Sequence, residues 1–186
     1  MENRTYKVGD IFNVSGSKSV NKDIAIKGDN SKYKNIPYIC RGKSENGCEG
    51  YYNYTPSQKK NCITIGSQGA HAFYQHKNFF TGTGVIVLRH EKLTENNALY
   101  FNTVINSVLK GYGYGYEVSQ DKLKEIEIQI PSIIHEDGTY EPDWDYMENY
   151  IKDIKSKVDI YTQDKINVIE NVKKHRNEKI DVSGWN

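Results

Sequence analysis

Two aspartates and a lysine in the last quarter of the chain have a spacing found in metal-dependent nucleases. Pro142-Asp143 followed by Asp153-Ile154-Lys155 formally matches the Pro-Asp…Asp-x-Lys pattern, in which carboxylates from adjoining strands hold magnesium. Here both acids fall in one uninterrupted amphipathic stretch that predicts a single helix. Their separation of ten positions then corresponds to about 15 Å, so the two carboxylates cannot share a metal ion.

Histidine and cysteine residues elsewhere do not form a metal-binding pattern. His71 and His76 have no partner Cys or Glu at ligand spacing, and Cys40, Cys48 and Cys62 are separated by 8 and 14 residues, which matches no zinc motif. The sequence also lacks a Gly-Lys-Ser/Thr phosphate loop, an amino-methyltransferase motif and a complete dinucleotide fingerprint. We therefore predict a non-catalytic protein with reduced thiols, no metal and no cofactor.

The charges divide unevenly between the two halves of the chain. Residues 1–90 contain 13 Lys and Arg against 6 Asp and Glu, a net charge of +7, whereas residues 91–186 contain 12 against 18, a net charge of −6. The basic half favours a polyanionic partner, although an uneven surface charge without a partner would give the same numbers. The start of the chain has no apolar signal segment and no window approaches 18 apolar residues, so we expect a cytoplasmic protein with no membrane partner.

Short β-type runs separated by Gly, Asn and Ser predict an irregular, mostly antiparallel sheet or half-barrel in the first half. The predicted strands lie within residues 5–14, 36–40, 51–54, 62–66, 71–74 and 84–89. Residues 15–35 are polar and contain several lysines, which predicts a loop that either is simply solvated or contacts phosphates.

The loops between these strands carry side chains that could bind nucleic acid in two ways. Arg, amide and hydroxyl groups can read base edges, whereas Lys mostly binds phosphate. The loop residues of both kinds are Arg41, Lys43, Lys59, Lys60, Ser67, Gln68, His71, Gln75, His76 and Lys77.

The second half is predicted to contain a helix, a glycine-rich turn and one strand. Thr94 is a suitable N-cap for a helix over residues 95–110, whose apolar face would consist of Ala98, Phe101, Ile105 and Val108. The sequence GYGYGYE at 111–117 is either a tight turn whose rings cover the sheet or a platform on which bases stack. Alternating Ile and Glu/Gln predict a strand over 123–131, and Pro142 is expected in the first turn of the last helix.

The last quarter of the chain predicts one long amphipathic helix. From Pro142 to about Asn177, steps of three and four residues define a stripe in which eight of ten positions are apolar or aromatic. A helix of about 35 residues is roughly 50 Å long, and its apolar seam requires a partner. Lys165 and His175 interrupt the stripe, so pairing is expected to be strongest before them. The predicted dimerisation residues are Trp144, Met147, Ile151, Ile154, Val158, Tyr161, Val168 and Val172.

Several stretches, taken in order, resemble the target recognition domains of type I restriction–modification specificity subunits. They span roughly residues 5–152 and read GDIFNV, IPYICRGKSENG, ITIGSQGAHAFYQHKNFFTGTGVIVL, NNALYFNTVI, YGYGYE, LKEIEIQIP and PDWDYMENYIK. The most specific part is the closing combination of a strand ending in Pro, a turn, and Pro-Asp-Trp…Met-Glu…Tyr-Ile at the start of a long helix.

The resemblance implies an α+β fold. An irregular, mostly antiparallel, β-rich target recognition domain with packed helices would occupy residues 1–141, and one long C-terminal coiled-coil-type helix with a short tail would occupy 142–186. The implied partners are double-stranded DNA, a methyltransferase (M) subunit and, through it, a restriction (R) subunit. The implied DNA-binding residues are the loop residues named above together with Lys18, Lys22, Lys32 and Lys34.

The sequence departs from the family pattern, because a full specificity subunit has two recognition domains separated by long helices that pair antiparallel. We therefore expect a half-length subunit, or an excised half, that forms a homodimer through its helix and reads a split palindromic target. Two alternatives stay open. One is the recognition fragment of a single-chain or bipartite restriction–methylation enzyme, and the other is a decoy half-subunit that occupies the methyltransferase.

Overall fold

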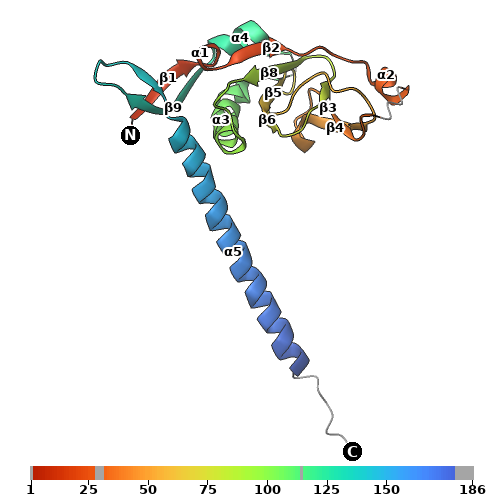
Figure 1. The fold of residues 1–186 in the computed structure, drawn as a ribbon, viewed down its shortest axis with the longest axis vertical. Coiled ribbons are helices and arrows are strands. Elements are labelled where there is room, and N and C mark those ends of the chain that lie inside the picture. Colours follow the sequence, from red (N-terminus) through yellow and green to blue (C-terminus); the bar gives the residue numbers. More distant parts are fainter. Residues whose placement is uncertain (1, 28–31, 114, 179–186) are drawn as a thin grey trace, which may run out of the picture. The chain divides into compact units, whose positions relative to one another are not determined.

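The computed structural model describes residues 2–27, 32–113 and 115–178, and the chain divides into two compact units, Met1–Glu148 and Asn149–Asn186 (Figure 1). The division falls inside the last helix, later than the boundary expected at residues 141 and 142. The elements of the first unit are β1 (Glu2–Lys7), α1 (Val8–Ile11), β2 (Asn13–Gly16), α2 (Lys22–Lys27), β3 (Ile36–Ile39), the 3-10 turn η1 (Glu45–Gly47), β4 (Cys48–Tyr52), β5 (Cys62–Gly66), β6 (Ala72–Gln75), β7 (Phe80–Thr81), β8 (Val85–Arg89), α3 (Glu95–Val108), the 3-10 turn η2 (Leu109–Gly111), α4 (Gln120–Glu125), β9 (Glu127–Ile134) and β10 (Tyr140–Pro142). Helix α5 (Trp144–Glu178) begins in the first unit and continues through the second.

The strands form three small sheets, which confirms the predicted α+β class. Their strand orders are β1-β9-β10, β2-β8-β5-β6 and β4-β3-β7. All strand pairs are antiparallel except β3 and β7, which run parallel with Tyr38 opposite Phe80. The architecture is therefore a set of separate sheets and not the half-barrel that the regular strand spacing also allowed.

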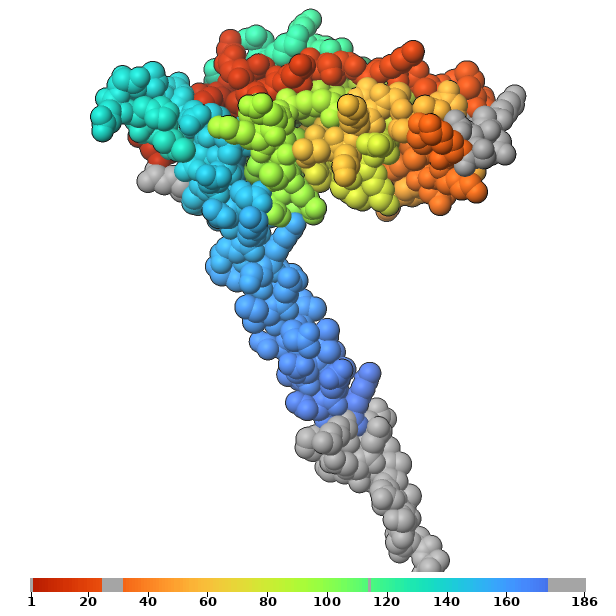
Figure 2. All heavy atoms as spheres, viewed as in Figure 1, coloured from red at the N-terminus to blue at the C-terminus, as the bar shows by residue number. Residues whose placement is uncertain are grey.

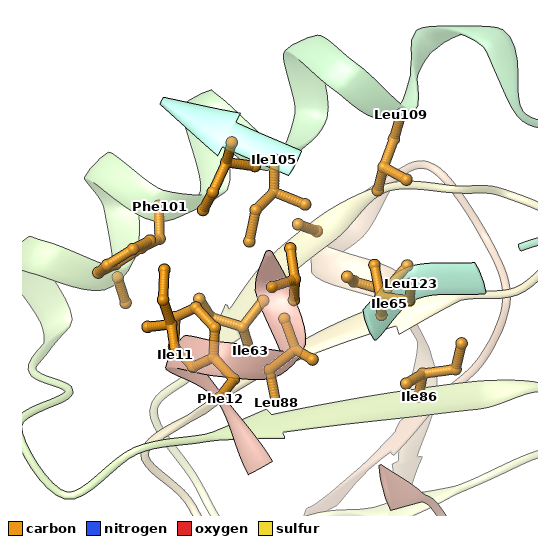
Figure 3. Packing of buried hydrophobic residues seen from close by; sticks show 14 of the residues in the cluster. Ile11, Phe12, Ile63, Ile65, Ile86, Leu88, Phe101, Ile105, Leu109 and Leu123 are labelled. Atoms are coloured by element: carbon orange, nitrogen blue, oxygen red, sulfur yellow. The ribbon is translucent and has the colours of Figure 1, made fainter. Parts of the chain in front are cut away.

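The central sheet is covered on both faces. One face of β5 and β8 presents its isoleucine and leucine side chains to Phe101, Ile105 and Leu109, which follow one another along α3 and η2 (Figure 3). The opposite face packs Cys62 and Val87 against residues of the neighbouring sheet. This double coverage explains why all of β5, including Thr64, and most of β8 are buried, without the alternation of a half-exposed strand.

Helix α3 begins as predicted and ends earlier than predicted. The Thr94 hydroxyl accepts a hydrogen bond from the Asn97 backbone N–H, and the Asn97 side chain accepts one from the Thr94 N–H, so the two residues form a capping box. Val108 is 37% exposed, which corrects its assignment to the apolar face. The chain changes from α to 3-10 geometry at Leu109, and this change places Leu109 in the core instead.

The predicted strand at 123–131 is wrong in its first residues. The Ser119 side chain accepts a hydrogen bond from the Lys122 N–H at 3.2 Å and caps the short helix α4, on which Leu123 is buried. The strand β9 then starts at Glu127, and only from there does the alternation of Ile with Glu and Gln describe a strand. A capped helical turn therefore precedes the strand in a stretch whose pattern predicts one element.

Other boundaries also differ from the predictions in the first half. The segment predicted as a loop at 15–35 contains α2 and an isolated bridge between Ser19 and Thr81, and the strand expected at 51–54 starts three residues earlier as β4. The two-residue strand β7 was not predicted, because two residues show no periodicity. Residues 28–31 of the loop and 179–186 of the tail lie outside the described residues.

The first turn of α5 is built into the core of the first unit. Pro142 pairs with β9 and does not begin the helix as predicted; the Asp143 carboxylate caps the helix by accepting the Tyr146 N–H at 2.9 Å. Trp144 and Met147 are buried in the main core. This burial corrects their assignment to the dimerisation seam, because both are already covered by their own domain.

We call Asp143, Trp144, Met147 and Glu148 the anchor of α5. The carboxylate of Glu148 lies at the N-terminus of α3. It accepts hydrogen bonds from the Thr94 hydroxyl, from Asn96 Nδ2 at 2.9 Å and from the Asn97 N–H at 3.3 Å. A negative charge at a helix N-terminus is favourable because the first N–H groups point toward it. The Pro-Asp-Trp…Met-Glu motif thus supplies a cap, two core residues and a carboxylate that joins two helices.

His90 makes this anchor sensitive to acid. Its ring stacks on Trp144 with centroids 4.4 Å apart, and its Nδ1 accepts the Lys92 N–H at 3.0 Å, which requires the neutral ring. Burial lowers the pKa of His90 below its ordinary value of 6.5. Because the unfolded chain binds the proton more readily, stability should be complete above pH 6.5 and should fall as the pH drops through the unfolded pKa toward the lower folded pKa.

His90→Gln tests this linkage, because glutamine keeps an acceptor for the Lys92 N–H and does not titrate. Urea unfolding between pH 7.5 and 5.5 should show a shallower loss of stability for the variant than for the wild type. Equal slopes for the two proteins would show that acid acts on other groups.

Candidate nucleic-acid interface

Most of the predicted DNA-binding residues lie in the segments just before and just after β3, β5 and β6. Figure 2 shows residues 32–50, in orange, at the end of the first unit away from the β9–β10 region, in cyan, whereas residues 60–75, in yellow, lie between them. The segment before β5 is close to the start of α3, because Asn61 Nδ2 donates to the Leu93 carbonyl at 2.8 Å.

The strands divide the candidate residues into two groups. After β3, the Arg41 backbone lies against Gly66 at the end of β5, so the residues that follow these strands come together. We call this group the arginine edge; it comprises Arg41, Lys43, Ser67, Gln68 and His71.

The second group, the lysine edge, lies at the other end of the β5–β6 hairpin. The Asn61 N–H donates to the Gln75 carbonyl at 2.8 Å and the Lys60 N–H donates to Asn78 Oδ1 at 2.9 Å, so the segments before β5 and after β6 are neighbours. The group comprises Lys59, Lys60, His76 and Lys77. The five residues of β5 correspond to about 17 Å of strand, which sets the scale of the distance between the two edges.

The lysine edge is held together by Arg89, which the sequence reasoning did not single out. Its guanidinium donates to the carbonyls of Lys59 at 2.7 Å and Lys60 at 3.2 Å and to Gln58 Oε1 at 3.2 Å. Among the described residues, the ammonium groups of Lys59, Lys60 and Lys77 have no ion-pair partner. The edge therefore presents unneutralised cations on a fixed backbone, as phosphate binding requires.

The four remaining lysines are distributed around these edges. Lys34 precedes β3 and Lys77 precedes β7; because these strands are parallel, both lysines lie toward the same end of their sheet. Lys32 lies over the Tyr33 ring at 5.4 Å. Lys18 is exposed beside β7, with its carbonyl bonded to the Thr81 hydroxyl.

Lys22 and Gln75 have structural partners. Lys22 forms an ion pair with Glu49. Gln75 is 4% exposed, and its amide donates to Thr64 Oγ1 at 2.9 Å and to the Asn46 carbonyl at 3.1 Å. The prediction that Gln75 lies on the binding surface is corrected, because an amide with these partners is an interior link between β6 and the turn before β4.

Two further contacts position the arginine edge. Gln68 Nε2 donates to Glu117 at 2.7 Å, and the Asn106 side chain bonds both the N–H (2.6 Å) and the carbonyl (3.2 Å) of Ala72, next to His71. Asn106 thus replaces a neighbouring strand at the open edge of β6. The signal for this role in the sequence is weak, since it is one polar residue beside the buried face of α3.

In the tyrosine-rich turn, the ring of Tyr116 has two neighbours from this chain. The rings of Tyr112 and Tyr116 stack with centroids 5.0 Å apart at 18°, and the Lys122 ammonium lies 4.6 Å from the centroid of Tyr116. Tyr116 is nevertheless 56% exposed, so the turn keeps an aromatic surface on which a base could stack. Tyr114 lies outside the described residues.

The three thiols are buried to different extents, Cys62 fully and Cys40 and Cys48 partly. All three cysteines are free, and burial raises the pKa of Cys62 and of Cys40 to about 11, so both remain protonated at neutral pH. Within residues 2–27, 32–113 and 115–178, no group of three His, Cys, Asp or Glu side chains could hold a metal ion. No helix in the same ranges is long and apolar enough to cross a membrane.

Comparison with known proteins gives one consistent picture. Residues 2–171 match the family described as type I restriction modification DNA specificity domain. The chain is 34% identical over 160 residues to the specificity subunit S.BcgI of a type II restriction enzyme from Heyndrickxia coagulans; the match covers 83% of this chain and 44% of that protein. The chain therefore spans less than half the length of this relative.

Solved structures share the fold at low identity. The S subunit of a type I restriction–modification system from M. genitalium superimposes with a TM-score of 0.59 at 18% identity, over 91% of this chain and 44% of that one. The HsdS subunit from Thermoanaerobacter tengcongensis gives a TM-score of 0.56 at 13% identity, over 87% and 39% of the two chains.

Proposed function

The chain belongs to the type I restriction–modification DNA specificity family, and from this premise we propose that it binds double-stranded DNA sequence-specifically and directs a methyltransferase subunit, and through it a restriction subunit, to the target. The expectation of a non-catalytic specificity protein is confirmed at the level of the family. The recognition of bases and phosphates by this chain, and its assembly with the other subunits, are proposals.

The observation that carries the proposal is the division of the candidate surface into two edges of different chemistry. Besides the ammonium of Lys43, the arginine edge combines a guanidinium, an amide, a hydroxyl and an imidazole, which can hydrogen-bond to base edges. The lysine edge offers unpaired ammonium groups, which bind phosphates regardless of sequence. On this proposal the lysine edge supplies affinity and register, while the arginine edge supplies specificity.

Changing Lys59, Lys60 and Lys77 to alanine should weaken binding to all duplexes while leaving sequence preference in place. Each lost phosphate contact should reduce the slope of log K against log[salt] by about 0.9, so three contacts should reduce it by about 2.7. Sodium chloride titrations with mixed-sequence duplex DNA measure this slope.

The control removes the same charge from three lysines that already have carboxylate partners. Lys7, Lys124 and Lys157 pair with Glu125, Asp121 and Asp153, respectively. Their alanine variant should keep the wild-type slope. If both triple variants changed the slope equally, net charge and not the lysine edge would explain the binding.

We also propose that two copies pair through α5. Support comes from an exposed apolar stripe beyond the first unit, which includes Ile154, Val158, Tyr161, Val168 and Val172. The side chain of His175, which was expected to interrupt this stripe, lies outside what the structure describes. A two-fold pair would present two identical recognition units and would favour a split palindromic target.

A second candidate function is favoured by the relative from Heyndrickxia coagulans, which is named as a subunit of a type II restriction enzyme. The chain could serve a bipartite restriction–methylation enzyme in the same way. Cells that express the chain with its methyltransferase should methylate one bipartite motif under either proposal. If cleavage of unmethylated DNA then requires no additional nuclease subunit, the bipartite enzyme is favoured.

The methylation map also tests the proposal as a whole. Methylation without sequence preference would contradict it, and tight binding to the methyltransferase without DNA binding would support the decoy alternative.

A further inference from the structure

Arg41 differs from the other arginines whose side chains are described. Arg4 forms an ion pair with Glu2. The guanidinium of Arg89 donates hydrogen bonds to two backbone carbonyls and to one side-chain amide at the lysine edge. In the described part of the chain, the guanidinium of Arg41 has neither a hydrogen-bond nor an ion-pair partner. Its exposed fork is therefore available to a ligand.

The backbone of Arg41 is held by two glycines of the β5–β6 turn. A Cβ atom at Gly69 would lie 2.3 Å from the Arg41 carbonyl oxygen, and a Cβ atom at Gly66 would lie 2.7 Å from the Arg41 Cα. Both distances are too short for any side chain, so the turn can approach Arg41 only because both residues are glycines. Just before Arg41, the Cys40 N–H donates to the Gly47 carbonyl at 2.7 Å, which fixes the chain from the other side.

A third glycine lies against the side chain. A Cβ atom at Gly84 would lie 2.8 Å from Arg41 Cδ and 2.7 Å from Ser67 Oγ. The Ser67 N–H donates to the Gly84 carbonyl at 2.8 Å, so Gly84 and Ser67 are held together next to the arginine stem. The stem of Arg41 is thus confined while its guanidinium remains unpartnered. We call Gly66, Gly69 and Gly84 the glycine cradle.

We propose that Arg41, positioned by the glycine cradle, is the principal specificity-determining residue of this unit and reads a guanine in the major groove of duplex DNA. The inference rests on the proposed function and adds the residue and the base. A guanidinium can bond the O6 and N7 of guanine with two parallel N–H groups, and no other base offers two acceptors in that arrangement. A confined stem loses less conformational entropy on binding than a free one, so discrimination is strongest where the side chain is already positioned.

The experiment selects bound duplexes from a pool of random-sequence double-stranded DNA, using the full chain, and sequences them. Arg41→Ala and Arg41→Lys test the fork, and Gly84→Ala tests the cradle, because its added methyl group must displace the arginine stem. Two controls match the cradle variant. Gly42→Ala adds a methyl group next to Arg41 where nothing lies within 4 Å, and Gly138→Ala adds one at a comparable positive φ, +83° against +71°, also in open space. Thermal unfolding of each variant monitors the fold.

The wild type should select a motif that contains a G·C pair. Changing that pair should cost the wild type roughly 5- to 150-fold in affinity, the range given by one bidentate contact. Arg41→Ala, Arg41→Lys and Gly84→Ala should lose this preference at the same position, with Arg41→Lys retaining overall affinity. Gly42→Ala and Gly138→Ala should keep it.

Different failures have different meanings. A wild type that selects no motif contradicts the proposed function itself. Weaker binding by Arg41→Ala to every sequence with the motif unchanged would make Arg41 a phosphate contact and overturn the inference. A Gly84→Ala protein that is folded and keeps the preference would overturn the role of the cradle. If Gly84→Ala does not fold, Arg41→Lys decides, because lysine keeps the charge and lacks the fork, and an unchanged motif in that variant would overturn the inference.

Discussion

Trp144→Ala is expected to destabilise the whole first unit by about 3–5 kcal/mol, although Trp144 is the first residue of the long helix. Its ring lies 5.1 Å from the Phe101 ring and 6.3 Å from the Phe12 ring, between centroids, and it stacks on His90. Truncation leaves a cavity among residues of α3 and the N-terminal segment, which the surrounding core can fill only partly. Urea unfolding followed by tyrosine fluorescence, which does not depend on the substituted ring, measures the loss, with far-UV circular dichroism as a second probe.

Ile160→Ala is the control, because Ile160 is an exposed apolar residue on the same helix and lies outside the proposed pairing stripe. It should leave the stability of the first unit within about 0.5 kcal/mol of the wild type, as is usual for surface positions. If Trp144→Ala lowered helix content and left the fluorescence transition of the core unchanged, the helix would not be anchored through this residue.

The burial of the first two stripe residues also shows what sequence periodicity cannot indicate. Trp144 and Met147 continue the same steps of three and four residues as Ile154 and Val158, so the stripe reads as one seam. The structure divides it, since the first two side chains are buried in their own domain and the later two are exposed. A periodic pattern reports that a face must be covered and does not report which part of the molecule covers it.

The remaining fold was predictable wherever local chemistry was decisive. Thr94 and the apolar runs of β5 and β8 gave correct elements because a cap or continuous burial determines them. The start of β9 was predicted wrongly because a helical turn capped by Ser119 precedes the strand. Strand β7 was not predicted because a strand of two residues depends wholly on its neighbours in the sheet.

The candidate site was predictable by residue type and not by role. Arg41 and Gln75 are both forked polar residues in loops or at strand ends, and only the fold distinguishes them. Arg41 keeps a free guanidinium on a glycine cradle, whereas the amide of Gln75 is used inside the protein. Partners far apart in the sequence, such as Arg41 with Gly69 and Gly84, leave no local pattern.

Val158→Glu is expected to convert a dimer of the full chain into a monomer at micromolar concentration. Val158 lies in the middle of the exposed stripe of α5 and is 55% exposed in the single chain. In a paired helix it would be covered, and a two-fold pair would bury the new carboxylate in both copies. An unpaired buried charge costs several kcal/mol, enough to abolish pairing. Sedimentation equilibrium measures the change in mass.

Ile160→Glu is the control that separates the seam from helix stability and from hydrophobicity in general. Ile160 is 61% exposed and lies two residues further along, about 200° around the helix from Val158. This variant should remain a dimer. Truncation after Lys152, which retains the complete first unit, should give a folded monomer, because the stripe beyond the anchor is lost. A dimer that survives both Val158→Glu and the truncation would locate pairing in the first unit, and α5 would then have to be covered by a different protein, for which the methyltransferase subunit is the first to test.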